Sequence, residues 1–148
     1  MLFSDHALSC RLEAAEGYAC REFAMARHRL FPESGSEAIR VAGADVVFDG
    51  SDSPITQTFG LGLFEPPASE NLEEIEEFLR TRGAPTQHEI SPFAGAVTLQ
   101  LLCARRYRPI EISHALYRPI ELPIEPSVRI EPSTHISVRV IDHNEAVL

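Results

Sequence analysis

Residues 55–63 read ITQTFGLGL, and this stretch, with the helix predicted after it, decides the expected fold. The larger side chains of the stretch fall on one face: Ile55, Gln57, Phe59, Leu61 and Leu63. The other face carries two threonines and two glycines. Alternation with a period of two predicts a strand, and the small residues let another group approach one of its faces closely.

The clearest helix is predicted over residues 69–82. Ser69 is the expected N-cap, and Gly83 stands where a helix stops. The apolar positions at helical spacing predict a buried stripe of Leu72, Ile75, Phe78 and Leu79. The acidic residues between them predict a solvated helix face: Glu70, Glu73, Glu74, Glu76 and Glu77.

A long helix is predicted over residues 4–30, with Ser4 as its N-cap. Its expected buried stripe comprises Leu8, Leu12, Ala15, Ala19, Phe23, Ala26 and Leu30. Residues 38–48 predict two strands or one bent strand, because Gly43 interrupts a β-rich run.

The chain continues with a short strand over residues 86–90 and a helix over residues 91–106, opened by Ser91-Pro92. This helix is expected to bury Phe93, Val97, Leu101 and Leu102. Residues 110–117 alternate again, which predicts a last strand. The element order indicates an α/β (α+β) fold, in which helices flank a mixed, mostly antiparallel sheet.

The composition argues against some classes of binding partner and favours one cellular compartment. The chain has 148 residues with a formal net charge of −9, which argues against nucleic acid and anionic membrane as partners. The three cysteines and six histidines show no metal-ligand spacing, so no metal is expected. No secretory leader or membrane-spanning run is present in the sequence, and we expect a cytoplasmic protein.

Prolines are frequent near the end of the chain, where they predict an extended segment instead of a helix. Residues 1–118 are expected to form one domain, and residues 119–135 an extended, proline-rich linker. Residues 136–148 begin with a strand-like run that stops soon after.

Several stretches follow, in order, the amino-terminal half of bacterial tandem-domain proteins of the GNAT superfamily of N-acetyltransferases, which this chain resembles. They are RLFPESGSEAIRVAGADVVFDGSDSPITQTFGLGLFEP, FLRTRGAP, HEISPFA and ARRYRPIEIS. The final VRVIDHNEAVL is similar to the opening of the second GNAT domain in such proteins. The resemblance implies acetyl transfer from acetyl-coenzyme A to an amine. It also implies that residues 136–148 begin a second domain that is missing here.

The resemblance makes Gln57, Gly60 and Gly62 candidates for holding the cofactor, since Gln-x-x-Gly-x-Gly cradles its pyrophosphate in the family. The spacing favours a core strand instead, because six residues separate Gly62 from Ser69 at the helix start. Two of these six residues are prolines, which remove N–H donors. Four glutamates crowd the helix start and repel an anion: Glu65, Glu70, Glu73 and Glu74.

Catalytic residues are harder to assign. Leu102 stands where the family often has a tyrosine acid, and a leucine cannot transfer a proton. Tyr107 fits an aromatic core position. His88 lies on the strand that commonly contacts substrate, so it is the candidate base, the alternative being a polar residue on a partly exposed strand.

Three functions remain open at this point, and one of them is a small acetyltransferase with an unusual site, whose turnover of acetyl-coenzyme A would fall with His88→Ala. The other two do not require catalysis by this chain alone. The first is a degenerate amino-terminal half of a GNAT acetyltransferase, inactive alone, whose partners are a small amine and a second GNAT domain. The second is a non-catalytic acyl-coenzyme A-binding or protein-interaction module, possible as a homodimer formed through the C-terminal tail.

Overall fold

The computed structural model describes residues 5–115. Ser4, the linker at 119–135 and residues 136–148 lie outside this range, as does the end of the strand predicted over 110–117. The contacts divide the chain into Met1–Ile110 and Glu111–Leu148. Residues 110–115 have no regular secondary structure, so the strand prediction is wrong there. The reason is a lack of packing: Ile110 and Ile112 are 82% and 84% exposed.

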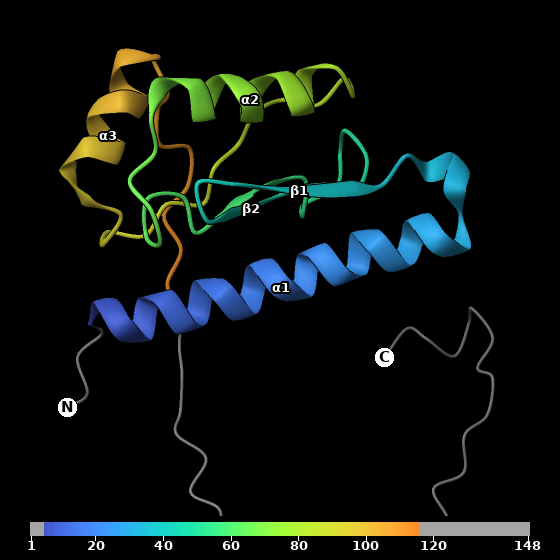
Figure 1. The fold of residues 1–148 in the computed structure, drawn as a ribbon, viewed down its shortest axis with the longest axis horizontal. Helices are drawn as coiled ribbons and strands as arrows, with labels where there is room; N and C mark the ends of the chain where they lie inside the picture. Colours follow the sequence, from blue (N-terminus) through green and yellow to red (C-terminus); the bar gives the residue numbers. More distant parts are fainter. Residues whose placement is uncertain (1–4, 116–148) are drawn as a thin grey trace, which may run out of the picture. The chain divides into compact units, whose positions relative to one another are not determined.

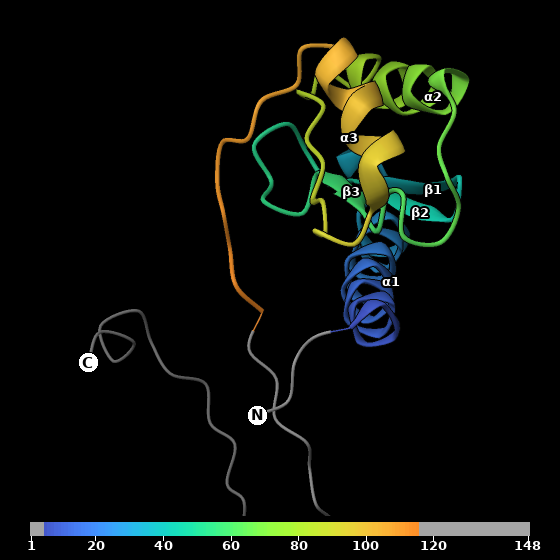
Figure 2. The same ribbon diagram turned by 90° about the vertical axis from the view of Figure 1, so that its left-hand side faces the viewer.

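The described part of the first unit, residues 5–110, contains three α-helices and three strands. Their order is α1 (His6–Leu30), β1 (Glu37–Val41), β2 (Ala44–Phe48), β3 (Gln57–Phe59), α2 (Ser69–Arg80) and α3 (Gly95–Ala104). A short 3-10 turn, η1 (Pro32–Ser34), joins α1 to β1. Helix α1 lies along one face of the sheet, and α2 and α3 lie over the other (Figures 1 and 2).

The sheet has the strand order β1-β2-β3, and both pairs are antiparallel. One isolated parallel bridge, between Thr58 and His88, adds residues 87–89 beside β3. The predicted α+β class is therefore confirmed at this coarse level. The two strands expected within residues 38–48 are confirmed, and the strand expected over 86–90 is reduced to this single bridge.

Strand β2 connects the two halves of the core because its residues alternate between the faces. Ala44, Val46 and Phe48 pack with the buried stripe of α2. Val47 points the other way and packs with Ala24 of α1. Its neighbours Asp45 and Asp49 share that face and bind arginines of α1, as described below. The α2 side of the sheet is thus apolar, and the α1 side is partly ionic.

Helix α1 is confirmed, but its predicted buried stripe is wrong. Its buried residues are Ser9, Gly17 and Ala24, whereas Phe23 and Leu30 are 57% and 73% exposed. The reason is close packing: a Cβ on Gly17 would lie 3.0 Å from Asp45 Oδ2 and 3.2 Å from Phe59 Cβ. Small side chains bring the helix onto the sheet, and bulky ones are turned outward. Asp5 caps the helix, accepting a 2.7 Å bond from Leu8 N–H.

Strand β3 ends earlier than the alternation predicts. Gly60 and Gly62 have φ of 76° and 80°, a left-handed conformation that breaks a strand. They form a turn directly after Phe59, in which Leu63 N–H donates to Gly60 O at 3.2 Å. Leu61 and Leu63 are still buried, so the apolar positions were identified correctly, although the backbone around them is not extended.

Helix α2 matches its prediction closely, since Leu72, Ile75, Phe78 and Leu79 are all buried. Ser69 is its first residue and not its cap. The N-cap is Ala68, whose N–H donates to Asn71 Oδ1 at 2.8 Å.

Helix α3 begins at Gly95, later than predicted. Ala94 N–H donates to Ser91 O at 3.0 Å, which closes a turn, and Gly95 has a φ of 82°. The late start changes the buried face. Leu102 is buried and Leu101 partly so, but Phe93 and Val97 are 39% and 56% exposed.

Gly62→Ala is expected to destabilise the protein by about 2 kcal/mol more than Gly83→Ala. Both glycines have positive φ, so both substitutions introduce backbone strain. A Cβ on Gly62 would also collide with the Thr98 side chain and lie 2.9 Å from Ala94 O, whereas Gly83 has open space. Urea unfolding of the two variants measures the difference, and equal losses would contradict the packing role of Gly62.

Candidate functional site

The bridge between β3 and residues 87–89 separates the predicted site residues onto two faces. Gln57 and Phe59 share the face that packs on α1. Glu89 lies on the same side, because Gln57 Nε2 contacts Glu89 Oε2 at 3.5 Å. His88 faces the other way, with its ring 4.8 Å from the ring of Tyr107. The two candidates Gln57 and His88 therefore do not meet at one site.

Glu13 of α1 lies near Glu89 and contacts the backbone directly after β3. Its Oε2 accepts a 3.1 Å hydrogen bond from Gly60 N–H. Burial, the nearby Glu89 and, to a lesser extent, Glu16 raise the pKa of Glu13 to about 7, although the Gly60 bond acts in the opposite direction. The Glu13 carboxyl can therefore accept or donate a proton near neutral pH.

The two glycines of the suggested cofactor cradle have other partners. The N–H of Gly60 donates to Glu13, and Gly62 packs against Thr98 and Ala94 at the start of α3. A pyrophosphate cradle needs N–H groups that point freely at the anion. This backbone instead binds a carboxylate and makes a tight contact with a helix.

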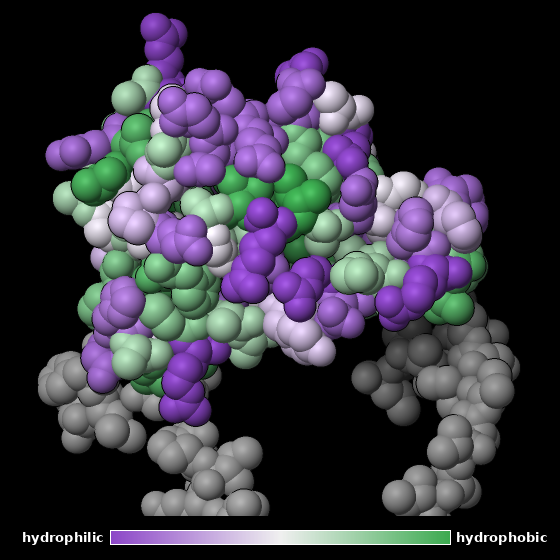
Figure 3. Space-filling view, in the orientation of Figure 1, coloured by the Kyte–Doolittle hydropathy of each residue, from purple (hydrophilic) through white to green (hydrophobic). Residues whose placement is uncertain are grey.

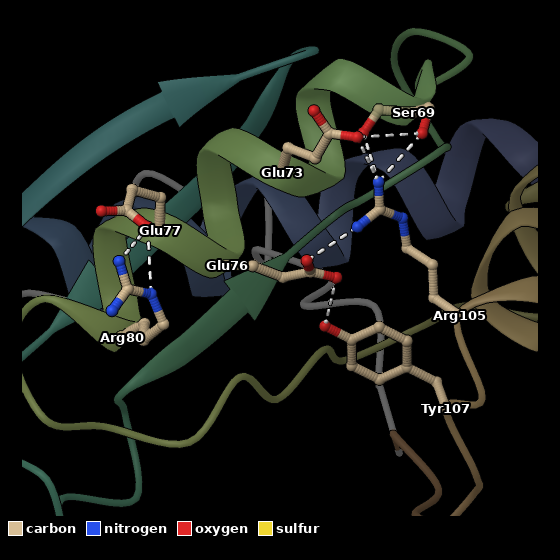
Figure 4. A network of polar contacts seen from close by, with 7 residues as sticks. All are labelled: Ser69, Glu73, Glu76, Glu77, Arg80, Arg105 and Tyr107. Atoms are coloured by element: carbon tan, nitrogen blue, oxygen red, sulfur yellow. Dashed lines mark hydrogen bonds and ion pairs between the residues drawn. The ribbon is translucent and has the colours of Figure 1, made fainter.

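The first two turns of α2 bind a cation that lies far away in the sequence. Arg105 donates to Ser69 O at 3.1 Å and to Ser69 Oγ at 2.9 Å, and it binds Glu73 and Glu76 at 2.8 and 2.7 Å (Figure 4). Glu76 is half-buried and also accepts a 3.1 Å bond from Tyr107 Oη. Burial and Glu76 raise the pKa of Tyr107 to about 12, so this phenol is a poor acid.

The acidic face predicted on α2 is only partly a solvated face. Glu77 is exposed and pairs with Arg80, while Glu73 and Glu76 hold Arg105 (Figure 4). The surface over α2 is mainly hydrophilic (Figure 3).

Both ring nitrogens of His88 are buried. Within residues 5–115, neither of its ring nitrogens has a hydrogen-bond partner, nor does the Oγ1 of the adjacent Thr58. Burial lowers the pKa of His88 to about 4, so the imidazole is neutral at physiological pH. This histidine packs against Tyr107 in the interior, and it is poorly placed to act as an exposed base.

A shallow groove of about 390 Å³ lies between α1 and the loop after β2. It is lined by Ala19, Cys20, Phe23, Asp49, Ser53, Pro54 and Ile55. Burial, helped by Glu16 and Glu89, raises the pKa of the Cys20 thiol, which disfavours the nucleophilic thiolate. The groove therefore offers an apolar surface and no activated nucleophile.

Within residues 5–115, the His, Cys, Asp and Glu side chains form no group of three that could hold a metal. None of the helices in the same range combines the length and apolar character needed to span a bilayer.

Comparisons with protein-family models, with curated proteins and with solved structures gave no match for this chain.

The sequence pattern missed Glu13 and Arg105, the two residues that organise these sites. Glu13 lies four positions after Ser9 and four before Gly17, so it belongs to the face of α1 that packs on the sheet. A search for small residues at helical spacing, in place of large apolar ones, would have found that face. Arg105 carries no comparable local signal, because its partners lie 29 to 36 positions away.

Proposed function

We propose that the chain is a non-transferring half of a GNAT-family N-acetyltransferase, in which it contributes to the site for the amine. The supporting observation is the acidic group at the end of β3, where Glu13 accepts the Gly60 N–H beside Glu89. An amine arrives protonated at neutral pH and must lose a proton before it attacks a thioester. Two carboxyl groups attract the ammonium, and one with a pKa of about 7 is suited to take its proton.

In this proposal, acetyl-coenzyme A is held by another GNAT domain. This division fits the occupation of the Gly60 N–H by Glu13 and the tight packing of Gly62 against Thr98. It also fits the neutral, enclosed state of His88, which leaves the Glu13 side of the sheet as the better proton acceptor.

Small primary amines such as ethylenediamine are expected to raise the melting temperature of the chain at millimolar concentration, and Glu13→Gln is expected to remove this shift. The matched control is Glu16→Gln, one turn further along α1. Calorimetric titration with acetyl-coenzyme A, with coenzyme A and ATP as controls, is expected to give no saturable heat. Selective binding of the coenzyme A ligands would contradict the proposal that another domain holds acetyl-coenzyme A. If the amine still raised the melting temperature of Glu13→Gln, the amine site at Glu13 would be contradicted.

A protein-interaction module is the second candidate, and exposed apolar side chains of α1 and of the residue after it favour it. Several large apolar side chains are more than two-fifths exposed there: Tyr18, Phe23, Met25, Leu30 and Phe31. Such a module gives no amine-dependent stabilisation in the titration above, which separates the two functions.

A further inference from the structure

Helix α1 carries a second apolar face, which the fold leaves largely exposed. Uncharged residues recur there at steps of three and four positions: Leu8, Leu12, Ala15, Ala19, Phe23, Ala26 and Leu30. At about 100° per residue they fall within a sector of about 80°, which we call the outer stripe. The buried Gly17 and Ala24 lie on the opposite side of the helix, against the sheet. Within residues 5–115, no α-helix or strand lies over the outer stripe (Figure 2).

The outer stripe is large enough to serve as a contact surface. Phe23 is 57% exposed and Leu30 is 73% exposed, and Ala15 and Ala19 are exposed as well. The stripe adjoins the groove described above, whose walls include Ala19, Phe23 and Ile55. From its first to its last residue the helix rises about 33 Å, and it is about 11 Å wide. The stripe therefore covers roughly 350 Å², the size of the largest apolar patches on single chains, which are often functional.

The spacing of the outer stripe is the same in both directions from Ala19. Ala15 and Phe23 lie four positions to either side of it. The more distant residues repeat this symmetry in two further pairs: Leu12 with Ala26, and Leu8 with Leu30. A two-fold axis at Ala19 therefore places the stripe of one chain on the stripe of an antiparallel second copy, which is the self-complementary arrangement of a symmetric dimer.

Large and small side chains meet across this axis. Phe23 of each copy lies opposite the small Ala15 of the other, and Leu12 lies opposite Ala26. At the axis Ala19 meets Ala19, so the two helices can approach closely and the larger side chains can interdigitate. A partner of different sequence gains nothing from this symmetry, whereas a second copy uses all of it.

Charges limit the strength of this contact. Each chain has a formal net charge of −9, and the axis brings Arg11 of one copy near Arg29 of the other at the solvated rim. Salt screens both repulsions. Roughly 350 Å² from each partner is also less than the about 800 Å² of a standard interface. The dimer is therefore expected to be reversible and to become stronger as salt is added.

We propose that the chain forms an antiparallel homodimer through the outer stripe of α1, with the two-fold axis at Ala19. The dimer is independent of the proposed amine site, because the bond from Gly60 N–H places Glu13 on the sheet side of α1. Pairing of the outer stripes neither covers nor completes the Glu13 group. The dimer and the amine site are therefore tested by separate measurements, and either can fail without the other.

Sedimentation of the 148-residue chain between about 1 and 200 μM, at about 0.15 M salt, tests the proposal. The average mass is expected to rise from that of one chain toward that of two. Ala19→Glu places two carboxylates at the axis, so it is expected to raise the dissociation constant at least about tenfold. Ala14→Glu is the matched control, since Ala14 is exposed on α1 but lies about 140° around the helix from the stripe. It is expected to change the dissociation constant less than about twofold.

The direction of the helices is tested by mixing two variants. Leu8→Glu and Leu30→Arg are each expected to raise the dissociation constant at least about tenfold, because each places a charge opposite a leucine. In an antiparallel dimer of one copy of each variant, the glutamate lies opposite the arginine at one end, and the native leucines meet at the other. An equimolar mixture is therefore expected to associate within about threefold of the wild type.

Three results would overturn the proposal. The first is a wild-type chain that is still monomeric at about 200 μM. The second is a dimer that Ala19→Glu and Ala14→Glu weaken equally, since the contact would then lie elsewhere, for example in residues 119–148. The third is a mixture no stronger than its separate variants, which excludes the antiparallel pairing. Circular dichroism at about 1 μM checks that each variant is folded, and Leu30→Arg replaces Ala19→Glu if that variant is not.

Discussion

Asp49→Ala is expected to destabilise the protein by about 4 kcal/mol, the range found when one partner of a buried ionic network is removed. Asp49 is 4% exposed. Its carboxylate accepts bonds from Arg27 at 2.7 Å, Ser36 at 2.8 Å and Ser53 at 3.1 Å. These partners come from α1, the residue before β1 and the loop after β2. Removing the carboxylate leaves the buried Ser36 hydroxyl unpaired and reduces the link to α1 to the 2.9 Å bond from Arg27 to the Asp49 backbone oxygen.

Chemical denaturation at pH 7 measures this loss, with Asp52→Ala as the matched control in the same loop. Asp52 is exposed, and its replacement is expected to change stability by less than about 0.5 kcal/mol. Asp49→Asn retains an oxygen for Ser36 and gives up the charge facing Arg27, so an intermediate loss is expected. An Asp49→Ala protein that loses less than about 1 kcal/mol would show that the network adds little to stability.

His88→Phe is expected to make the protein more resistant to acid, by about 3 kcal/mol relative to the wild type between pH 7 and pH 4. Burial lowers the pKa of His88 from its usual 6.5 to about 4. Between these values the unfolded chain binds a proton that the folded protein does not, so stability is full above pH 6.5 and is lost as the pH falls toward 4. Phenylalanine cannot bind the proton, and its ring can still pack on Tyr107.

Urea midpoints of the two proteins at several pH values measure this difference. Thr58→Val is the matched control, because it removes the other buried, unpartnered polar atom of the same cluster without removing a titratable group. It is expected to change stability by a similar amount at every pH. If the His88→Phe and wild-type curves run parallel from pH 7 to pH 4, His88 does not carry the acid sensitivity.

The sequence pattern predicted β2 and α2 well and the packing of α1 badly, for the same physical reason. A burial pattern can be recognised in a sequence when the large apolar residues are also the buried ones, as Leu72 and Ile75 are. On α1 they are separated, because Gly17 and Ala24 allow a close approach and Phe23 is turned outward. Likewise, the alternation in residues 55–63 identified buried positions, but it did not reveal the positive φ of Gly60.

The candidate site was predictable only where its chemistry is local. The Gln57–Gly60 string and His88 stand out in the sequence, but Gln57 begins β3 and Gly60 follows its end. Glu13, the partner of Gly60, comes from a helix 47 positions before it. Burial decides the protonation state of His88, and the spacing of residues in the sequence does not show how deeply a single imidazole is buried.

Two ionic contacts tie the number of helix residues between Arg21 and Arg27 to the number of residues between Asp45 and Asp49 in and after β2. Arg21 binds Asp45, and Arg27 binds Asp49, so the helix and the strand run in the same direction. Six residues of helix rise about 9 Å, and four residues of strand about 13 Å, which leaves the arginine side chains to span the difference. One residue inserted between Arg21 and Arg27 would rotate the later arginine by about 100° around the helix axis. The spacing within this part of α1 is thus a constraint on length, independent of the amino acids that occupy its outer face.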